Sequence, residues 1–376
     1  MKKDVTEPTY KIAPCYKDMP RSLFGHLSET VGELTESHRK VAQVLEVLRV
    51  EDHVREHRRF RGRSKKSRKG IARALVAKAV LGIPTTKHLI ERLKVDRTLS
   101  KICGFLDGLV PSESVFSRAF GVLAEKSLLN EVHQFLVQIH FSDVVVLNAA
   151  IDATAIHARE EPVAKPKKER KAKKKRGRKK KGEYVEPKGP TRQETQLEQS
   201  WDISLAELPN VCDIGAKRNS KGHDEHWIGY KLHVSVSEGG VPLAVCLTSA
   251  SVHDSQVAIP LIQMVHARVL ACCYHLMDKA YIGQPIKKMA GSLGQVAIVQ
   301  GKTAPGETES KPLANWLKTA EERRLEGRTV VERFNSDLKD NHGGNSVRVK
   351  GWKKVQTHLM FGVLAIFAFA ILRLQN

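Results

Sequence analysis

The sequence contains few cysteines, and their spacing does not suit a metal or disulfide framework. Six cysteines are spread over 376 residues, with no C-x-x-C pair and no zinc-like spacing among them. A small secreted disulfide scaffold and the common structural zinc motifs are therefore not indicated. We expect reduced, mostly buried thiols in a cytoplasmic protein: Cys15, Cys103, Cys212, Cys246, Cys272 and Cys273.

The sequence also lacks a hydrophobic run that would cross a bilayer comfortably. The apolar stretch at 359–372 has 14 residues, whereas a spanning helix needs about 20. A buried helix at about 353–374 is the better interpretation. Lys2, Lys3 and Asp4 open the chain without an apolar core behind them, so we expect no signal peptide. No membrane association and no internal repeat are predicted.

Acidic residues are too few to balance the basic ones. The chain has 63 Lys and Arg against 41 Asp and Glu, a net charge of +22. Residues 165–181 carry a net charge of +12 and residues 58–69 a net charge of +8, so these two basic clusters hold nearly all of the excess. Such clusters release counterions from phosphates and give salt-dependent affinity. The pattern predicts DNA as a partner, with a solvated linker or a localisation tract as the alternative for each cluster.

Particular residues in both clusters are candidates for DNA contacts. Around Gly177, the second cluster resembles the Arg-Gly-Arg core of peptides that enter the narrow A-T minor groove, although the usual following proline is absent. The predicted DNA-binding residues of the two clusters are Arg58, Arg59, Arg61 and Arg63 in the first, and Lys175, Arg176 and Arg178 in the second.

Residues 1–140 are predicted to form a mostly helical region for DNA binding and assembly. Leucines and valines at 26–49 recur at helical spacing. A Gly-Ile-Pro break at 82–84 separates two further helical segments, and Ser112 is a candidate N-cap. Short helices beside a basic cluster suit a helix-turn-helix-like region. A plain helical bundle fits the same pattern.

The pattern changes to α/β over residues 141–376. A β-branched apolar run at 144–151 is typical of a buried central strand. Runs at 226–236 and 241–248 flank a Gly-Gly turn and predict a hairpin. Strands at 273–277 and 296–299 then alternate with helices at 255–267, 284–289 and 329–339. This order predicts an RNase H-like domain with a mixed sheet flanked by helices. The polar, lysine-rich residues at about 160–222 are expected to form a basic, poorly ordered insertion.

Two aspartates follow predicted strands of this sheet. Asp152 comes after the strand at 144–151, and Asp278 after the strand at 273–277. Neighbouring strands lie about 4.8 Å apart, so carboxylates at adjacent strand ends repel each other unless a cation lies between them. Mg²⁺ prefers such hard oxygen ligands. The two aspartates therefore predict a divalent-metal site at the edge where α/β sheets place their ligands.

Glu332 is the candidate third carboxylate. On a helix, Arg328, Glu332, Asn335 and Lys339 fall on one face. A stripe about a quarter-turn away is apolar and would pack on the sheet: Val331, Phe334 and Leu338. Glu332 could thus complete the metal site while Arg328 and Lys339 hold phosphates. Surface ion pairs are the alternative for this face.

Several motifs together resemble bacterial insertion-sequence transposases with a DDE domain, in the group numbered four and five. The most specific is Arg328-x3-Glu332-x6-Lys339, which matches the Arg, Glu and Lys of that family's C-terminal signature. Other similar segments are IDATAIHA at 151–158, GYKLHV at 229–234, SVHDSQV at 251–257, MDKAY at 277–281 and the stretch at 89–119. Leu325 stands where the signature has tyrosine, which puts any DNA-end contact by that tyrosine in doubt, and Ala280 replaces the usual glycine.

The resemblance implies a metal-dependent DNA transposase. Asp152, Asp278 and Glu332 would bind two Mg²⁺ or Mn²⁺ ions, one activating a water or later a DNA 3′-hydroxyl, the other stabilising the leaving oxygen. Element ends would be cleaved and joined to target DNA. The resemblance further implies a homodimer or higher assembly on DNA, in the bacterial cytoplasm and at the nucleoid.

Two other sites and two other functions remain open at this point. Asp254 is interpreted first as a helix cap, and second as a rival metal ligand. His223, His226 and His233 are a weaker candidate for zinc. A non-catalytic DNA-binding protein derived from a transposase, or an RNase H-like nuclease without strand transfer, would share most of these features.

Overall fold

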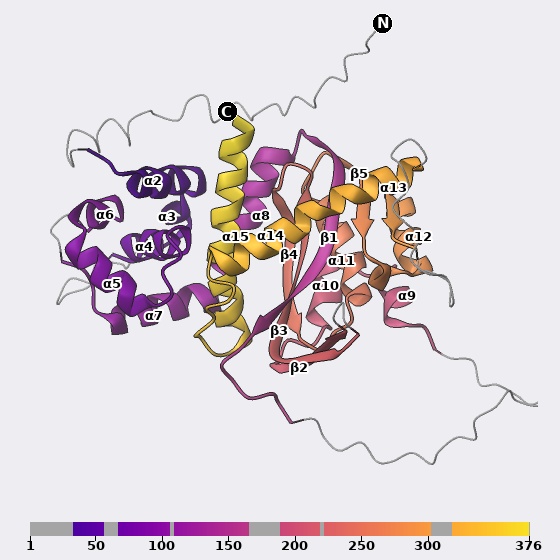
Figure 1. Ribbon diagram of the computed structural model, residues 1–376, viewed down its shortest axis with the longest axis horizontal. Helices are drawn as coiled ribbons and strands as arrows, with labels where there is room; N and C mark the ends of the chain where they lie inside the picture. The colour runs from indigo at the N-terminus through magenta and orange to yellow at the C-terminus, as the bar shows by residue number, and fades with distance from the viewer. Residues whose placement is uncertain are drawn as a thin grey trace, which may run out of the picture.

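A helical region and a mixed sheet meet on either side of one long C-terminal helix (Figure 1). The computed structural model describes residues 33–55, 67–105, 109–164, 189–218, 222–301 and 318–375. All structural statements below concern these residues. The predicted α/β class with a helical N-terminal region is confirmed.

The helical region begins where capping side chains and apolar periodicity favour helices. Thr35 and His38 form a capping box at the start of the first helix. The predicted break at Gly82 separates two helices, and this glycine has φ of +61°. Ser112 lies at the N-cap position of the next predicted helix, but its side chain makes no capping hydrogen bond. The helices are α2 (Glu36–Leu48), α3 (Val50–His53), α4 (Arg68–Val80), α5 (Thr86–Val95), α6 (Arg97–Ile102), α7 (Glu113–Glu125) and α8 (Leu128–Phe141). Whether this region binds DNA as a helix-turn-helix stays a prediction.

The sheet combines a parallel half and an antiparallel half. β1 pairs in parallel with β5, which pairs in parallel with β6, while β3 pairs antiparallel with β1, β2 and β4. This is the mixed arrangement predicted from the order of the sequence patterns. The strands are β1 (Val145–His157), β2 (Asp213–Arg218), β3 (Asp224–Ser237), β4 (Pro242–Ser249), β5 (Ala271–Met277) and β6 (Val296–Val299).

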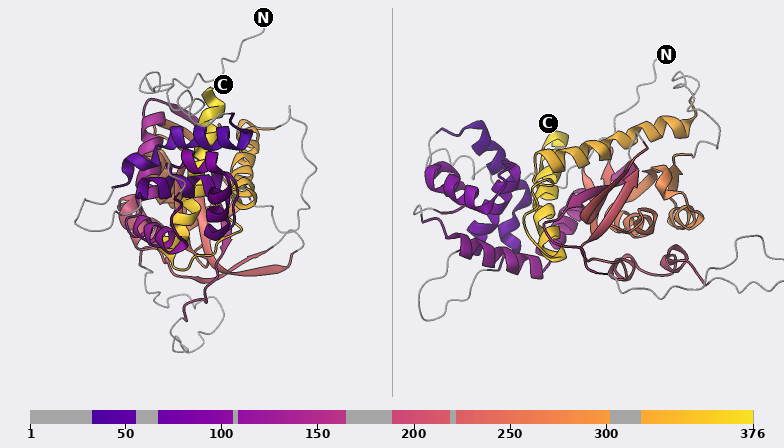
Figure 2. Two further views of the ribbon diagram at one scale, coloured as in Figure 1. Left: turned by 90° about the vertical axis from the view of Figure 1, so that its left-hand side faces the viewer. Right: turned by 60° about the horizontal axis from the view of Figure 1, so that its bottom comes forward.

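Helices cover both faces of the sheet. The right-hand view of Figure 2 places the yellow-orange α14 on one face and the orange α11 and α12 on the other. Helix α14 contacts β1 and β3 and buries the predicted stripe of Val331, Phe334 and Leu338. The helices are α11 (Ser255–His266), α12 (Gln284–Ser292), α13 (Ala320–Leu325) and α14 (Thr329–Asp340), with short 3-10 turns η2 (Lys279–Tyr281) and η3 (Glu326–Arg328).

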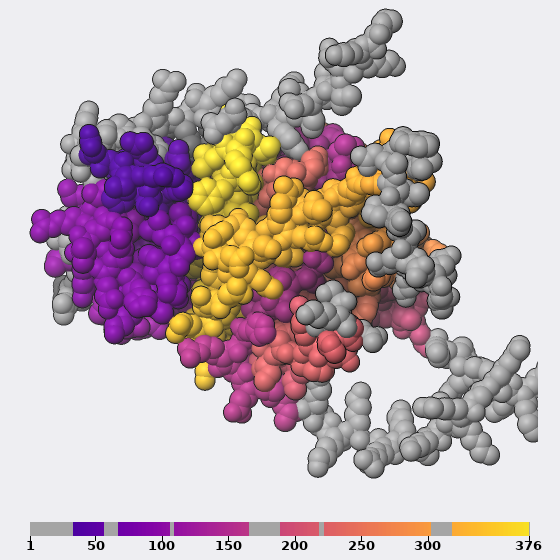
Figure 3. All heavy atoms as spheres, in the orientation of Figure 1, coloured from indigo at the N-terminus to yellow at the C-terminus, as the bar shows by residue number. Residues whose placement is uncertain are grey.

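The C-terminal helix α15 (Trp352–Gln375) lies in the core between the two regions. It packs against α2, α4, α7 and α8 on one side, and against α14 and β4 on the other. A helix that is apolar all round has to be buried. Of the described helices, α15 alone has the length and composition of a membrane span, yet 83% of its most apolar window is buried inside the protein. Figure 3 shows the C-terminal segment in yellow between the purple helical lobe and the rest of the chain.

Part of the expected insertion is folded. It contains α9 (Arg192–Gln196), α10 (Trp201–Ala206) and the edge strand β2. Thr191 and Glu194 form a capping box on α9, and Gln193 and Gln196 donate hydrogen bonds to backbone oxygens at the start of α11. The prediction of poor order is therefore wrong for 189–218, because local caps and tertiary hydrogen bonds stabilise short helices that composition alone did not reveal. Residues 165–188 lie outside the described part.

Candidate active site

Strand register places Asp152 and Asp278 at the same level of two neighbouring strands. In the parallel pair of β1 and β5, Ile151 lies opposite Met277, the last residue of β5. Asp152 and Asp278 are the residues that follow these two. Because paired strands are about 4.8 Å apart, the two carboxyl groups leave the sheet close to each other.

The prediction that the first strand ends at Asp152 is wrong. β1 continues to His157, and over its last residues it pairs with β3 on its other side, with Asp152 opposite Val234. Only the pairing with β5 runs out at Ile151. Asp152 therefore lies inside a continuous strand. Its backbone is still paired with β3 on one side but no longer with β5 on the other, so it is held more firmly than at a strand end.

Burial and negative neighbours act on the Asp152 carboxyl group. Burial is the main cause that raises the pKa of Asp152 from 3.8 to about 6, and the charges of Asp254 and Asp278 raise it further. The backbone N–H of Ala153 and the charge of Arg328 oppose this shift. Three carboxyl groups are thus close enough to interact, and the net effect on Asp152 still favours its protonated form. This is the electrostatic setting that a divalent cation relieves.

Helix α14 reaches the site through Asn335. Its side-chain amide Nδ2 donates a hydrogen bond to Oδ2 of Asp152 over 3.1 Å. Asn335 is buried, and its Oδ1 has no hydrogen-bond partner among the described residues. Sequence periodicity put Asn335 on the same helix face as Glu332, but gave no reason to choose it as the residue that contacts Asp152.

The carboxylate of Glu332 points to Arg328 rather than to the aspartates. Nη2 of Arg328 lies 2.7 Å from Oε1 of Glu332, and the Glu332 side chain is 52% exposed. The described residues contain no group of three or more metal-ligating side chains that could hold an ion. Yet Glu332 lies three residues before Asn335, a spacing that puts both on one helix face. Glu332 therefore lies one helical turn from the residue that contacts Asp152, and its side chain pairs with Arg328.

Asp254 belongs to this site, contrary to its first interpretation as a helix cap. It stands at the N-cap position of α11 but makes no capping hydrogen bond. Its Oδ1 lies 2.8 Å from Nζ of Lys231 on β3, and the same Nζ donates to the backbone oxygen of Val252 over 2.9 Å. Lys231 was not predicted as a site residue. The GYKLHV segment contained it, but only the tertiary structure brings it to Asp254.

Tyr281 is a second residue that the sequence did not single out. Its ring is fully buried, and its hydroxyl group has no hydrogen-bond partner among the described residues. Burial raises the pKa of Tyr281 well above its ordinary value, and the charges of Asp254, Asp152 and Asp278 act in the same direction. The phenol therefore stays neutral, and its hydroxyl group is free to donate or accept a hydrogen bond at this site.

The predicted DNA contacts are divided between described and undescribed residues. Arg328, the N-cap residue of α14, and Lys339, in its last turn, lie on either side of Asn335 in the sequence, and Lys339 interacts electrostatically with Asp152. Burial is the main cause that lowers the pKa of Lys339. The other candidates lie outside the described residues: Arg58, Arg59, Arg61, Arg63, Lys175, Arg176 and Arg178.

The three histidines do not form a metal site in the described structure. His226 and His233 are seven residues apart on β3, which corresponds to about 23 Å along a strand. His233 is fully buried and is hydrogen-bonded through Nε2 to Thr248 Oγ1 at 2.9 Å. The distance along β3 excludes a zinc ion shared by this pair.

Two family comparisons match this chain. Residues 193–368 match the family described as "Transposase DDE domain", and residues 28–121 match "Transposase domain (DUF772)". The first match runs from α9 into α15 and includes Asp278 and Glu332 but not Asp152, and the second covers most of the described helical region. No curated protein and no solved structure matches the chain.

Proposed function

The chain belongs to the DDE transposases, and we propose that it cleaves DNA at the ends of its element and joins those ends to target DNA. The observation that carries this proposal is the juxtaposition of Asp152 and Asp278 on neighbouring parallel strands beneath α14. A family match alone does not distinguish an active enzyme from a DNA-binding descendant. The presence of both Asp152 and Asp278 at this position of the sheet supports the interpretation as an active enzyme.

Asp152, Asp278 and Glu332 are the residues that would hold Mg²⁺ or Mn²⁺, in a site for two ions. The fit rests on the mutual repulsion of the carboxyl groups around Asp152 and on its raised pKa. Bound divalent cations would neutralise phosphate charge and lower the pKa of an attacking water or 3′-hydroxyl. Asp254 is already neutralised by Lys231, so we assign it a supporting position rather than a metal-binding one.

The side chains of α14 then have distinct roles. Glu332 leaves Arg328 and turns towards Asp152, a rotamer change for an exposed side chain. Arg328, once released, can bind a DNA phosphate, and Lys339 does the same about three helical turns further along. Asn335 holds the Asp152 carboxylate in one orientation. DNA binding thereby assembles the site.

Further parts of the proposal rest on the family resemblance. We place the chain in insertion-sequence group four/five, acting as a homodimer or higher assembly on paired element ends in the bacterial cytoplasm. The basic clusters at 58–69 and 165–181 would add sequence-independent affinity for DNA.

The test is Mg²⁺-dependent cleavage of supercoiled DNA that carries the element ends. Wild type is compared with Asp152→Asn, Asp278→Asn and Glu332→Gln, and DNA binding is measured without metal for these proteins and for the control. Glu321→Gln is the matched control, because Glu321 is an exposed carboxylate on α13 with no role in the site. We expect cleavage in wild type and control, and a loss of at least about 100-fold in the three site variants with binding retained.

The same experiment separates the alternatives. Binding without cleavage in every protein would favour a non-catalytic DNA-binding protein. Cleavage without covalent joining of labelled ends to a plasmid would favour an RNase H-like nuclease. Cleavage that survives in Asp152→Asn would contradict the proposed site itself.

A further inference from the structure

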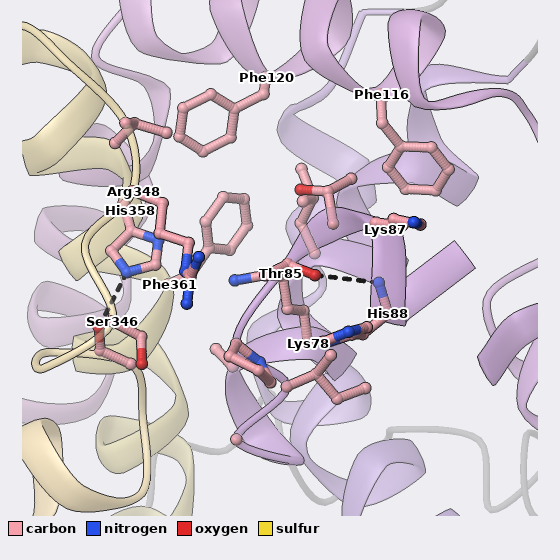
Figure 4. Close-up of a pocket in the computed structure, with 18 of the residues that line it drawn as sticks. Lys78, Thr85, Lys87, His88, Phe116, Phe120, Ser346, Arg348, His358 and Phe361 are labelled. Carbon is pink, nitrogen blue, oxygen red and sulfur yellow. Dashed lines mark hydrogen bonds between the residues drawn. The ribbon is translucent and has the colours of Figure 1, made fainter. Parts of the chain in front are cut away.

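A cavity of about 530 Å³ lies where the helical region meets the segment after α14. Figure 4 shows the side chains that face it. Residues of α4, of the turn at 82–85, of α5 and of α7 form one side, and the loop at 342–349 together with α15 forms the other. Its volume is in the range of small-molecule sites, about 300–1,000 Å³. The cavity is separate from the carboxyl groups described above.

The lining of this cavity carries an excess of positive charge. Three cations line it, Lys78, Lys87 and Arg348, against one carboxylate, Glu113. The imidazole of His358 also lines it, and burial lowers the pKa of His358 to about 4, so this ring is neutral at physiological pH. The net charge of the lining is therefore positive.

Of these cations, Lys78 gives the strongest indication that an anion binds in the cavity. In the described part of the chain it has neither an ion pair nor a hydrogen bond, although its side chain is only partly accessible. Burial, and then the charge of Arg348, lower the pKa of Lys78 to about 8. Two cations from opposite walls therefore repel each other across the cavity. Such an arrangement is relieved by an anion between them.

The remaining lining is aromatic and hydroxylic. Phe120 is half-buried and presents an aromatic surface, backed by the buried side chains of Phe116 and Phe361, and the rings of Phe120 and Phe361 stack with centroids 6.4 Å apart. Thr85 and Ser346 add hydroxyl groups on opposite sides (Figure 4). An aromatic wall beside paired cations and hydroxyl groups matches a nucleotide, which has a flat base and a phosphate.

The location of the cavity relates it to the catalytic helix. Eight residues of α14 separate Glu332 from Asp340, and the lining loop begins two residues later. Eight helical residues span about 12 Å, and a DNA strand advances about 3.4 Å per nucleotide. A strand following α14 would reach the cavity about three to four nucleotides from the carboxyl groups.

We propose that this cavity binds one nucleotide of a DNA strand, with its phosphate between Lys78 and Arg348 and its base against the ring of Phe120, which Phe361 backs. The inference rests on the proposed function in so far as DNA is the substrate. It adds a nucleotide site that is separate from the site of strand cleavage. Through this site, the helical region and the C-terminal segment would contact the same DNA strand as the carboxyl groups.

The test measures binding of a labelled single-stranded octamer to the full chain in EDTA, by fluorescence anisotropy at several salt concentrations. The variants are Lys78→Met, Arg348→Met and the double variant. Exposed cations outside the cavity, Lys94→Met and Lys350→Met, are the matched controls. We expect the double variant to bind at least about tenfold more weakly, and the salt slope to fall by about 0.7 for each lost phosphate contact. Wild-type affinity and slope in the double variant would overturn the proposal.

A second variant tests the space rather than the charge. Ser117→Trp places a large side chain at an exposed lining position, and thermal unfolding verifies that it folds. We expect Ser117→Trp to bind the octamer more weakly. Thymidine 5′-monophosphate should displace the octamer from wild type but not from this variant. Equal competition by inorganic phosphate would overturn the base contact, and competition by the mononucleotide without octamer binding would show a free-nucleotide site instead.

The outcomes remain distinct from those of the cleavage experiment. If wild type cleaves DNA while the cavity variants bind the octamer normally, the inference fails and the proposed function stands. If the cavity variants lose binding while wild type cleaves nothing, the inference stands and the proposed function fails.

Discussion

Asn335 donates a hydrogen bond from α14 to the carboxyl group of Asp152 over 3.1 Å. This bond joins the helix that carries Glu332 to the central strand. A neutral amide at this position adds no charge to a site that already contains Asp254 and Asp278 in range of Asp152. The amide thus orients one carboxyl group without adding to the repulsion among the three.

The first prediction replaces this amide with a carboxyl group. Asn335→Asp puts a buried like charge beside Asp152, so we expect the free energy of unfolding at pH 8 to fall by about 1–3 kcal/mol without metal. At pH 5 the two groups share a proton, and most of the loss should disappear. Added Mg²⁺ should also restore stability at pH 8. Urea unfolding at both pH values, with and without Mg²⁺, measures all three effects.

An exposed version of the same contact provides the control. Nδ2 of Asn341 donates to Oδ1 of Asp337 over 2.8 Å in solvent. Asn341→Asp makes the same chemical change where water screens it, and should cost less than about 0.5 kcal/mol. Equal losses in the two variants would contradict a special electrostatic role for the Asp152 environment.

Much of the site followed from patterns in the sequence. The β-branched run before Asp152 and the apolar run before Asp278 predicted two central strands, and parallel pairing put their following residues side by side. Helical periodicity likewise put Glu332 on the same helix face as Asn335, which contacts Asp152. These inferences depend on backbone geometry, which short-range patterns determine well.

The rest depended on contacts between distant parts of the chain. Periodicity places Glu332 and Asn335 on one face, but rotamers decide that Asn335 contacts Asp152 while Glu332 pairs with Arg328. Lys231 meets Asp254 only because β3 passes the start of α11. Composition showed that α15 is buried, but not that it packs into the helical region from the far end of the chain. These features come from tertiary packing.

The second prediction concerns pH. The pKa of Asp152 in the folded protein, about 6, is above its ordinary value of 3.8, so between these pH values the folded state binds more protons than the unfolded state. Stability from this group therefore decreases as pH rises from about 4 to above 6. We expect Asp152→Asn to stabilise the metal-free protein at pH 8 by up to about 3 kcal/mol, and the gain to vanish near pH 4.

Calorimetric unfolding across this pH range, in EDTA, is the measurement. Asp254, Asp278, Arg328 and Lys339 all act on Asp152, so each must be left unchanged. Asp143→Asn is the control, because that carboxylate is exposed just before β1. Mg²⁺ should raise the melting temperature at pH 8 in wild type and in Asp143→Asn, but not in Asp152→Asn. A variant less stable than wild type at pH 8 would contradict the raised pKa.

The third prediction tests the ion pair of Lys231 and Asp254. The two side chains are 13% and 27% exposed, so removing one partner leaves a poorly solvated charge. Lys231→Met should destabilise the protein by about 1–3 kcal/mol, and adding Asp254→Asn should recover most of that loss. The exposed pair of Lys217 and Glu225, 3.3 Å apart, should show a coupling of about 0–1 kcal/mol in the same double-mutant cycle. Equal coupling in both pairs would argue against partial burial as the cause.

The fourth prediction concerns the packing of α15 against the end of α14. A Cβ atom at Gly362 would lie 2.6 Å from the backbone oxygen of His342 and 2.7 Å from Cδ1 of Leu338. The leucine side chain could move, but the carbonyl group belongs to the loop that also lines the cavity, and it would have to shift with the backbone. We expect Gly362→Ala to destabilise the protein by about 1–3 kcal/mol.

Gly121 provides the matched control for this substitution. It lies inside α7, and a Cβ atom there would have no neighbour within 4 Å. Gly121→Ala should therefore stabilise the protein by about 0.5–1 kcal/mol through helix propensity alone. Opposite signs in the two variants, measured by urea unfolding, would establish that close helix packing and not glycine chemistry requires Gly362. Since the displaced backbone leads to Arg348, Gly362→Ala should also weaken octamer binding, whereas Gly121→Ala should leave it unchanged.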